Sequence, residues 1–255
     1  MKGTAVYRLI RGLVKAVYPK MEVVGTENLP DEPCVVVGNH TQMNGPIAAE
    51  LYFPGERAIW CAGQMMNWDE VADYAFEDFW SFKPKRVQWF YRIVSKLIVP
   101  LSVCVFNNAH TIPVYRDTRI ISTFRLSIAR LKEGANIIIY PEHNQKRNNI
   151  VYDFQDKFID LARFYYKQTG VELSFVPMYI APALKKMYLG TPIRFHADAP
   201  IGEERRRICD ELMDSIARIA CSLPLHTVVP YRNIGRRNYP KNLPFEVYDN
   251  EKTGG

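Results

Sequence analysis

Three residues whose side chains can move protons or hold anions stand at the ends of apolar, strand-like runs. His40 follows CVVVGN, Arg116 follows TIPVY, and Glu142 follows NIIIYP. A histidine there can accept a proton near neutral pH, an arginine can hold an anion, and a glutamate can orient the histidine. Each residue alone is more often structural: a hydrogen-bonded histidine, a surface ion pair or a cap. Their chemistry therefore depends on whether the fold brings them together.

The elements that must position these residues are strands and helices in alternation. Strand-like runs occupy 21–25, 34–40, 58–63, 111–116, 136–142, 173–181 and 192–197. Helical apolar spacing covers 123–135, 154–170 and 203–220. This alternation predicts an α/β fold, one domain with a mostly parallel sheet and helices on both faces. Binding sites of such sheets lie beyond the carboxyl ends of the strands, where all three residues stand.

Three segments are expected: a basic amphipathic helix over 1–20, the α/β domain over 21–222, and an extended tail over 223–255. The first segment carries Leu9, Leu13 and Val17 at helical spacing among basic residues, with no acid before Glu22. It fits a helix packed on the domain, and it equally fits a helix lying on an anionic membrane surface.

Composition narrows the class of partner. The chain has 255 residues, a net charge of +6 and a pI near 9.0, which favours an anionic partner. No nucleic-acid motif accompanies the charge, so no nucleic acid is expected. The five scattered cysteines lack any C-x-x-C pair, which favours a reducing, cytoplasmic compartment over a disulfide framework or a zinc site.

Two further segments are relevant to whether the protein contacts a membrane. The most apolar run, 97–106, contains a proline and is too short to span a bilayer, so it is expected to be a buried strand or an interfacial patch. The aromatic segment 68–101 changes from acidic to basic along its length. It predicts a helical hairpin that packs on the sheet, or alternatively a membrane-facing lid that admits an acyl chain.

The order of the runs resembles one family, the glycerophospholipid acyltransferases of the lysophosphatidate type. GTENLPDEPCVVVGNH resembles its first block, which ends in N-H-x-x-x-x-D, and TIPVYR resembles its second. IIIYPEHNQ, FVPMYI and LGTPIRF resemble the third block, the fourth block and the strand that follows. The resemblance covers roughly residues 20–222. It implies transfer of a fatty acyl group from acyl-CoA or acyl-carrier protein to a hydroxyl of a lysophospholipid or glycerol-phosphate-type acceptor, with no other cofactor.

The family's first block pairs a histidine base with an aspartate that orients it. Asn39 and His40 match this block, but Gly45 stands where the aspartate belongs. The resemblance implies that His40 is the general base, with Asn44 or Glu142 as its orienter. Asn44 equally fits the start of a helix over 46–53, ahead of Pro46. If His40 holds the family's geometry, an aspartate at position 45 should raise activity.

The remaining site residues are carried over from the other blocks. The resemblance implies an anion clamp of Arg116 with Lys146 and Arg147, and a role for Pro177 near the acyl donor. His143 replaces a glycine, so it should crowd the acceptor pocket or take a role of its own. No ligand spacing supports a metal site.

The expected protein is a divergent, peripheral acyltransferase on the inner face of the cell membrane, and the sequence leaves its oligomeric state open. The alternative is a non-catalytic protein that binds phospholipid or acyl thioester at the membrane surface.

Overall fold

The computed structural model describes residues 4–115 and 117–243, so Arg116 lies outside the described residues. The chain divides into two compact units. One unit contains Met1–Tyr18 and Ala58–Leu126, and the other contains Pro19–Arg57 and Ser127–Gly255. We call them the helical unit and the sheet unit.

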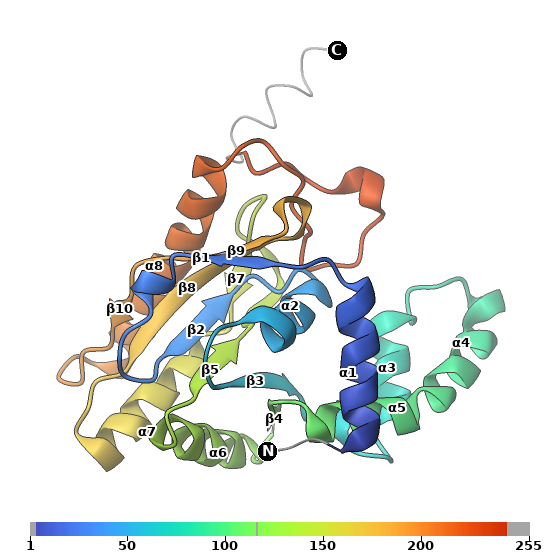
Figure 1. The fold of residues 1–255 in the computed structure, drawn as a ribbon, viewed down its shortest axis with the longest axis horizontal. Helices are drawn as coiled ribbons and strands as arrows, with labels where there is room; N and C mark the ends of the chain where they lie inside the picture. Colours follow the sequence, from blue (N-terminus) through green and yellow to red (C-terminus); the bar gives the residue numbers. More distant parts are fainter. Residues whose placement is uncertain (1–3, 116, 244–255) are drawn as a thin grey trace. The chain divides into compact units, whose positions relative to one another are not determined.

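The sheet unit is built on a mixed, mostly parallel sheet (Figure 1). Its strands run in the order β1-β9-β8-β2-β5, with β10 also paired to β8. The bounds are β1 (Glu22–Val24), β2 (Val35–Gly38), β5 (Asn136–Ile139), β8 (Ser174–Ala181), β9 (Lys186–Leu189) and β10 (Ile193–Arg194). β2 is parallel to both β5 and β8, β1 is parallel to β9, and only the β8–β9 and β8–β10 pairs are antiparallel. The predicted α/β class with a mostly parallel sheet is confirmed.

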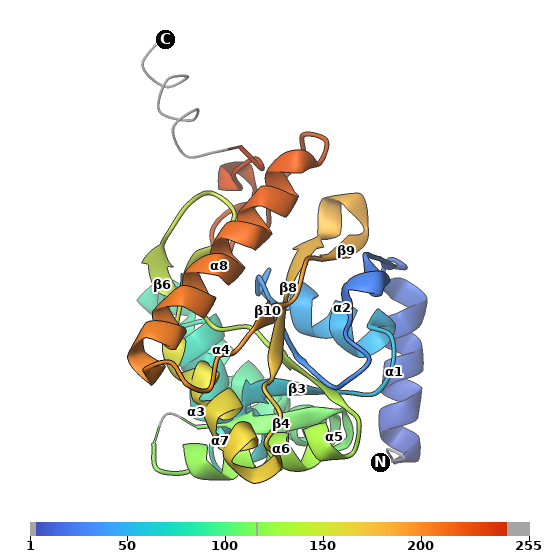
Figure 2. The ribbon, with the colours of Figure 1, turned by 90° about the vertical axis from the view of Figure 1, so that its left-hand side faces the viewer.

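Strand β2 lies at the centre of this core. Val35, Val36 and Val37 are fully buried, and Val36 lies opposite Ile138 of β5 and Val176 of β8. An uninterrupted apolar run suits a strand that is covered on both faces. Figure 2 shows α2 (Asn44–Tyr52) and α8 (Ile201–Ser222) on opposite sides of β8. Helix α7 (Asp160–Thr169) contacts α8.

The helical unit contains one parallel strand pair, β3 (Arg57–Ala62, whose first residue belongs to the sheet unit) with β4 (Thr111–Val114). Its helices are α1 (Ala5–Val17), α3 (Val71–Phe79), α4 (Lys85–Leu97) and α5 (Val99–Asn108), and α6 (Ile120–Lys132) starts in this unit and ends in the other. α1 contacts α5, and the Thr4 main-chain N–H donates to Asn108 Oδ1 at 3.1 Å. The predicted hairpin at 68–101 takes the form of α3 against α4.

The buried strand or patch expected at 97–106 is largely helix α5 instead. Pro100 lies in the first turn of that helix, where its missing N–H costs no hydrogen bond. In the part of the chain that the structure describes, no single helix is long and apolar enough to cross a membrane. α4 and α5 meet that test only as a pair bent by 46°.

Two strand regions depart from the sequence prediction. Residues 142–146 and 152–154 form a separate antiparallel hairpin, β6 (Glu142–Lys146) with β7 (Tyr152–Phe154). The helix expected from Phe154 therefore starts later, at Asp160, after a 3-10 turn over Asp156–Ile159. The apolar periodicity of 154–170 was misleading because Phe154 is buried as a strand residue.

The tail returns to the sheet unit and is fastened there. Tyr179 Oη and His226 Nε2 lie 2.7 Å apart, and both side chains are buried. The Asn242 side chain accepts from the His226 main-chain N–H at 2.8 Å and donates to the Ala220 carbonyl at 2.7 Å. Residues 224–242 therefore form a loop closed at both ends against α8 and β8.

Candidate active site

His40 stands immediately beyond β2, and its neighbour Asn39 extends the sheet by one step. Asn39 is buried; its Oδ1 accepts from the Ile180 main-chain N–H at 2.7 Å, and its Nδ2 donates to the Ile180 carbonyl at 3.2 Å. A side-chain amide can replace a peptide group in this way because it carries the same donor and acceptor. Asn39 thus fixes where the β2 chain leaves the sheet and where His40 begins.

Glu142 holds the main chain of His40 from the neighbouring strand end. Its carboxylate is buried and accepts from the main-chain N–H groups of His40, at 2.5 Å, and Tyr152, at 2.8 Å. Burial raises the pKa of Glu142 to about 7, and the two main-chain hydrogen bonds oppose that rise. Glu142 therefore positions His40 through the main chain.

The imidazole ring of His40 lies between two tyrosine rings. Tyr140 is 5.4 Å away at 65° and Tyr231 is 5.8 Å away at 83°, both edge to face. Such contacts between rings are favourable and directional. Burial lowers the pKa of His40, and neighbouring main-chain carbonyls of Gln42 and His40 offset part of that effect. The ring is therefore a neutral base near pH 7.

The His40 ring nitrogen Nδ1 is buried and has no hydrogen-bond partner among the described residues. The orienter expected from Asn44 or Glu142 is not found at this atom. Asn44 Nδ2 donates to the Thr41 carbonyl at 3.0 Å, and Asn44 is the first residue of α2. The turn between His40 and α2 is tight, with φ of 45° at Thr41 and 56° at Gln42, in the left-handed region that residues other than glycine rarely occupy.

Gly45 has no room for a side chain in this structure. A Cβ at this position would lie 2.5 Å from the His40 carbonyl oxygen and 3.0 Å from Tyr140 Cε1. The Gly45 main-chain N–H donates to that same carbonyl at 3.2 Å. The Tyr140 ring and the turn itself thus occupy the space next to Gly45, so a side chain at position 45 requires the turn to rearrange.

The basic residues after Glu142 are placed in different surroundings. Lys146 Nζ donates to Asn149 Oδ1 at 2.8 Å, whereas Arg147 forms ion pairs with Asp210 at 2.9 Å and Asp214 at 3.0 Å, both on α8. The structure therefore does not hold Lys146 and Arg147 together as one clamp, because the Arg147 charge is already neutralised. Arg116 lies outside the described residues.

His143 and Pro177 also have structural contacts of their own. His143 Nδ1 accepts from the Gln145 main-chain N–H at 3.3 Å, which stabilises the start of the hairpin. Pro177 lies opposite Val37 of β2, and its carbonyl accepts from the Gly190 main-chain N–H at 2.8 Å. No group of three or more metal-ligating side chains is found within residues 4–115 and 117–243.

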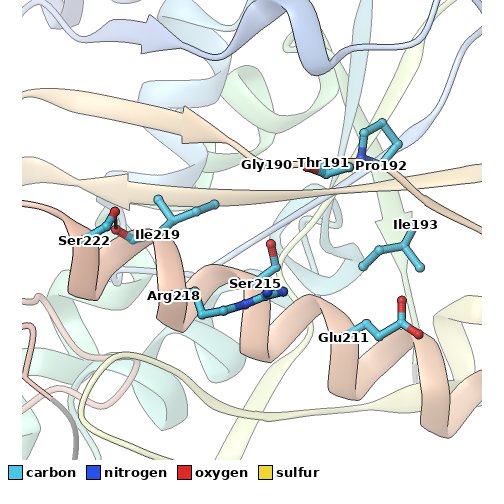
Figure 3. A pocket seen from close by; sticks show the side chains of 9 residues that line it. All are labelled: Gly190, Thr191, Pro192, Ile193, Glu211, Ser215, Arg218, Ile219 and Ser222. Atoms are coloured by element: carbon cyan, nitrogen blue, oxygen red, sulfur yellow. Dashed lines mark hydrogen bonds between the residues drawn. The ribbon is translucent and has the colours of Figure 1, made fainter.

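A larger and a smaller hollow are present among the described residues of the sheet unit. The larger, about 600 Å³, lies between α8 and the β9–β10 connection, and Figure 3 shows Glu211, Ser215 and Arg218 projecting into it from the helix. A Cβ on Gly190 would lie 2.9 Å from Pro177 Cγ, so Pro177 packs against Gly190, one of the residues that line this hollow. The smaller, about 160 Å³, lies between Lys146, Asn149 and Tyr152 and the tail.

Several residues of the site were missed from the sequence. Tyr140 stands directly before Pro141-Glu142, so its position in the third block was a usable signal. Tyr231 has no local signal, because it reaches His40 only through the fold of the tail. Asn149 looked like one of several polar residues in the loop 144–149.

Comparison with known proteins finds a similar solved structure. No family model matches the chain, and no curated protein matches it. The chain is similar to the 1-acyl-sn-glycerophosphate (LPA) acyltransferase PlsC from Thermotoga maritima, with a TM-score of 0.47 and 18% sequence identity. The alignment covers 84% of this chain and 79% of that one. A similarity at this level leaves the function to be argued from the residues.

The raised pKa of Glu142 predicts how the stability of the protein depends on pH. Its pKa is raised in the fold, so the folded protein binds this proton more tightly than the unfolded chain does. The free energy of unfolding should therefore fall by on the order of 3 kcal/mol between pH 5 and 8 on account of Glu142. Urea denaturation at several pH values measures this fall.

The matched variant for this prediction is Glu142→Gln, which cannot ionise. It should be less stable at pH 5, because one main-chain N–H loses its acceptor, and it should lack the fall through pH 7. Subtracting the free energy of unfolding of the variant from that of wild type cancels the contributions of other titrating groups. His40 is one of them, and its lowered pKa makes stability rise with pH instead of fall. The exposed Glu27→Gln should keep the wild-type slope; equal slopes in wild type and Glu142→Gln would contradict the assignment.

Proposed function

We propose that this chain transfers an acyl group from an acyl-CoA or acyl-carrier-protein thioester to a hydroxyl of a lysophospholipid or glycerol-phosphate-type acceptor. The observation that carries the proposal is the convergence of three sequence blocks at one edge of the sheet unit. Asn39-His40 is bound to Ile180 of β8 on one side and to Glu142 on the other. The first, third and fourth blocks of the family resemblance are thus linked by direct hydrogen bonds.

In the proposed reaction, His40 accepts the proton of the acceptor hydroxyl while the oxygen attacks the thioester carbonyl. The new C–O bond forms, the C–S bond breaks, and the proton passes to the departing thiolate. His40 is suited to the first step because its lowered pKa keeps it unprotonated near pH 7. Tyr140 and Tyr231 fix the plane of the ring by packing.

The missing carboxylate sets the expected rate. Loss of the acid partner in a serine-protease triad costs about 10⁴ in rate, since the acid fixes the tautomer and supports the charged ring. His40 Nδ1 has no such partner among the described residues. We therefore expect slow transfer. The same observation favours the second candidate, a protein that binds lipid or thioester without turnover.

A transfer assay distinguishes these functions. Purified protein is incubated with labelled acyl-CoA or acyl-carrier protein and a set of lysophospholipids, with glycerol 3-phosphate as a soluble acceptor. Labelled product above the His40→Ala background supports the transferase. Retention of lipid or thioester with no product from any acceptor would replace the transferase with the binding function.

We also propose that the helical unit binds a phospholipid surface, on the inner face of the cell membrane. α1 exposes one apolar stripe, with Leu9 65%, Leu13 62% and Val17 83% accessible. Arg8, Arg11 and Lys15 flank the stripe. α4 exposes Trp89 and Leu97 in the same unit. An apolar stripe flanked by basic residues fits an anionic interface.

Leu13→Glu is expected to weaken binding to vesicles containing phosphatidylglycerol by at least about tenfold, because it removes buried apolar area and adds a repelled charge. Vesicle co-sedimentation measures the change. Leu225→Glu is the matched control, because Leu225 is 65% exposed but lies in the tail. Equal losses in both variants, or no binding by wild type, would contradict a membrane face on α1.

A further inference from the structure

The smaller hollow of the sheet unit is closed by the tail. Its floor is formed by Lys146, Asn149 and Tyr152 of the β6–β7 hairpin, and its roof by tail residues. The roof residues are Pro230, Ile234, Asn238 and Pro240. A volume of about 160 Å³ is sufficient for a phosphate group with part of the molecule that carries it.

The side-chain amide of Asn149, which lines this hollow, has a hydrogen-bond donor that no described residue accepts from. Its side chain is only 6% exposed, and Lys146 fixes the amide by donating to Oδ1 at 2.8 Å. Nδ2 is buried and has no hydrogen-bond partner among the described residues. A buried donor without an acceptor costs about 1–3 kcal/mol, so such groups are retained mainly where a ligand or water accepts from them.

Basic residues lie around the hollow. Lys146 contributes an ammonium group beside Asn149. Burial raises the pKa of the Tyr152 hydroxyl; the nearby positive charge of Arg232 opposes that rise, and the negative charge of Glu142 adds to it. A 3-10 turn at Arg236–Asn238 brings two more arginines to the roof segment. An amide donor beside a lysine ammonium group, with arginines in the roof segment, matches an oxyanion with several acceptor atoms.

The hollow is also connected to His40. The Tyr231 ring lies 5.7 Å from that of Tyr152 and 5.8 Å from that of His40. Gln42, two residues after His40, donates to Tyr239 Oη at 3.1 Å and to the Arg232 carbonyl at 3.3 Å. The tail therefore contacts both the base and the hollow.

We infer that Lys146 and Asn149, closed over by residues 230–240, form a binding subsite for a phosphate ester. Its assignment to the acceptor rests on the proposed function, whereas phosphate binding itself can be measured without acyl transfer. A bound phosphate joins the hairpin to the tail, so it also holds the tail against the site. The ligand's source is either a soluble phosphate ester or a phospholipid headgroup.

The test uses the full chain and titration calorimetry with inorganic phosphate and glycerol 3-phosphate at constant ionic strength. Lys146→Met and Asn149→Asp should each weaken binding by at least about tenfold. Asn149→Asp preserves shape but replaces the donor with a charge that repels the anion. Lys167→Met, an exposed lysine of α7, should bind as wild type does.

A second arm uses vesicles of phosphatidylcholine with or without phosphatidate to identify a headgroup. Phosphate should also slow trypsin cleavage at Arg232, Arg236 and Arg237 in wild type and in Lys167→Met, but not in Asn149→Asp. Dependence on Lys146 and Asn149 in either arm supports the subsite. Absence of binding up to about 10 mM in both arms, or equal affinity in all variants, overturns it whether or not acyl transfer is found.

Discussion

Replacing His40 by alanine is expected to reduce acyl transfer to background. The imidazole is the proposed proton acceptor, and a contribution of 10²–10⁴ from one acid–base group is typical. The variant should still fold, because the contact to Glu142 comes from the main-chain N–H of residue 40 and not from its ring. Initial rates with labelled thioester, together with circular dichroism of both proteins, measure this.

His143→Ala is the matched control for His40→Ala. Its ring lies on the adjacent hairpin and accepts only a local hydrogen bond from Gln145, so transfer should stay within a few fold of wild type. Equal losses in the two variants would indicate that the effect comes from disturbed structure.

The pH dependence of the transfer rate tests the role of His40 in a second way. A base must be unprotonated, so the rate should rise with pH and reach half its maximum below 6.5, because burial lowers the pKa of His40. A midpoint clearly above 6.5, or transfer by His40→Ala at the wild-type rate, would show that another group is the base.

Gly45→Ala is expected to destabilise the protein by about 3 kcal/mol or more. The added methyl would lie 2.5 Å from the His40 carbonyl oxygen and 3.2 Å from its carbonyl carbon. These are main-chain atoms of a turn that is fixed by Asn39, Glu142 and the start of α2, so they cannot move away cheaply. Thermal and urea denaturation measure the loss.

Gly202→Ala provides the contrast, because nothing lies within 4 Å of a Cβ at Gly202 in α8. It should be neutral or stabilising by about 0.5–1 kcal/mol, since alanine favours helix. Gly45→Asp carries the same clash as Gly45→Ala and should not raise activity. A stable, more active Gly45→Asp would mean that the turn after His40 opens to the family geometry.

Most of the sheet unit follows from the sequence because its signals are local. Runs such as CVVVG and NIIIY have no polar residue to place on a solvated face, so they must be buried strands of a mainly parallel sheet. Strand β9 and the β6–β7 hairpin were not predicted, because these short segments become strands only through pairing with neighbours.

Some residues of the site could also be predicted from local sequence. Asn39, His40 and Glu142 follow strand ends, and the carboxyl ends of neighbouring parallel strands necessarily meet at one edge of the sheet. The sequence could therefore place a histidine and a glutamate near each other. It could not show that Glu142 binds the His40 main chain, since that depends on which way the chain turns after β2.

By itself, the sequence determined the α/β class and the central apolar strands, because periodicity encodes these features. That an aspartate could be expected at position 45, where the chain has Gly45, came from the family resemblance alone. Only the tertiary structure decided what surrounds His40 and its neighbours. It packs Tyr140 and Tyr231 against His40, leaves Gly45 no room for a side chain, and brings the tail over Lys146 and Asn149. These contacts join residues far apart in the chain, and contacts of that kind are set by packing and not by local pattern.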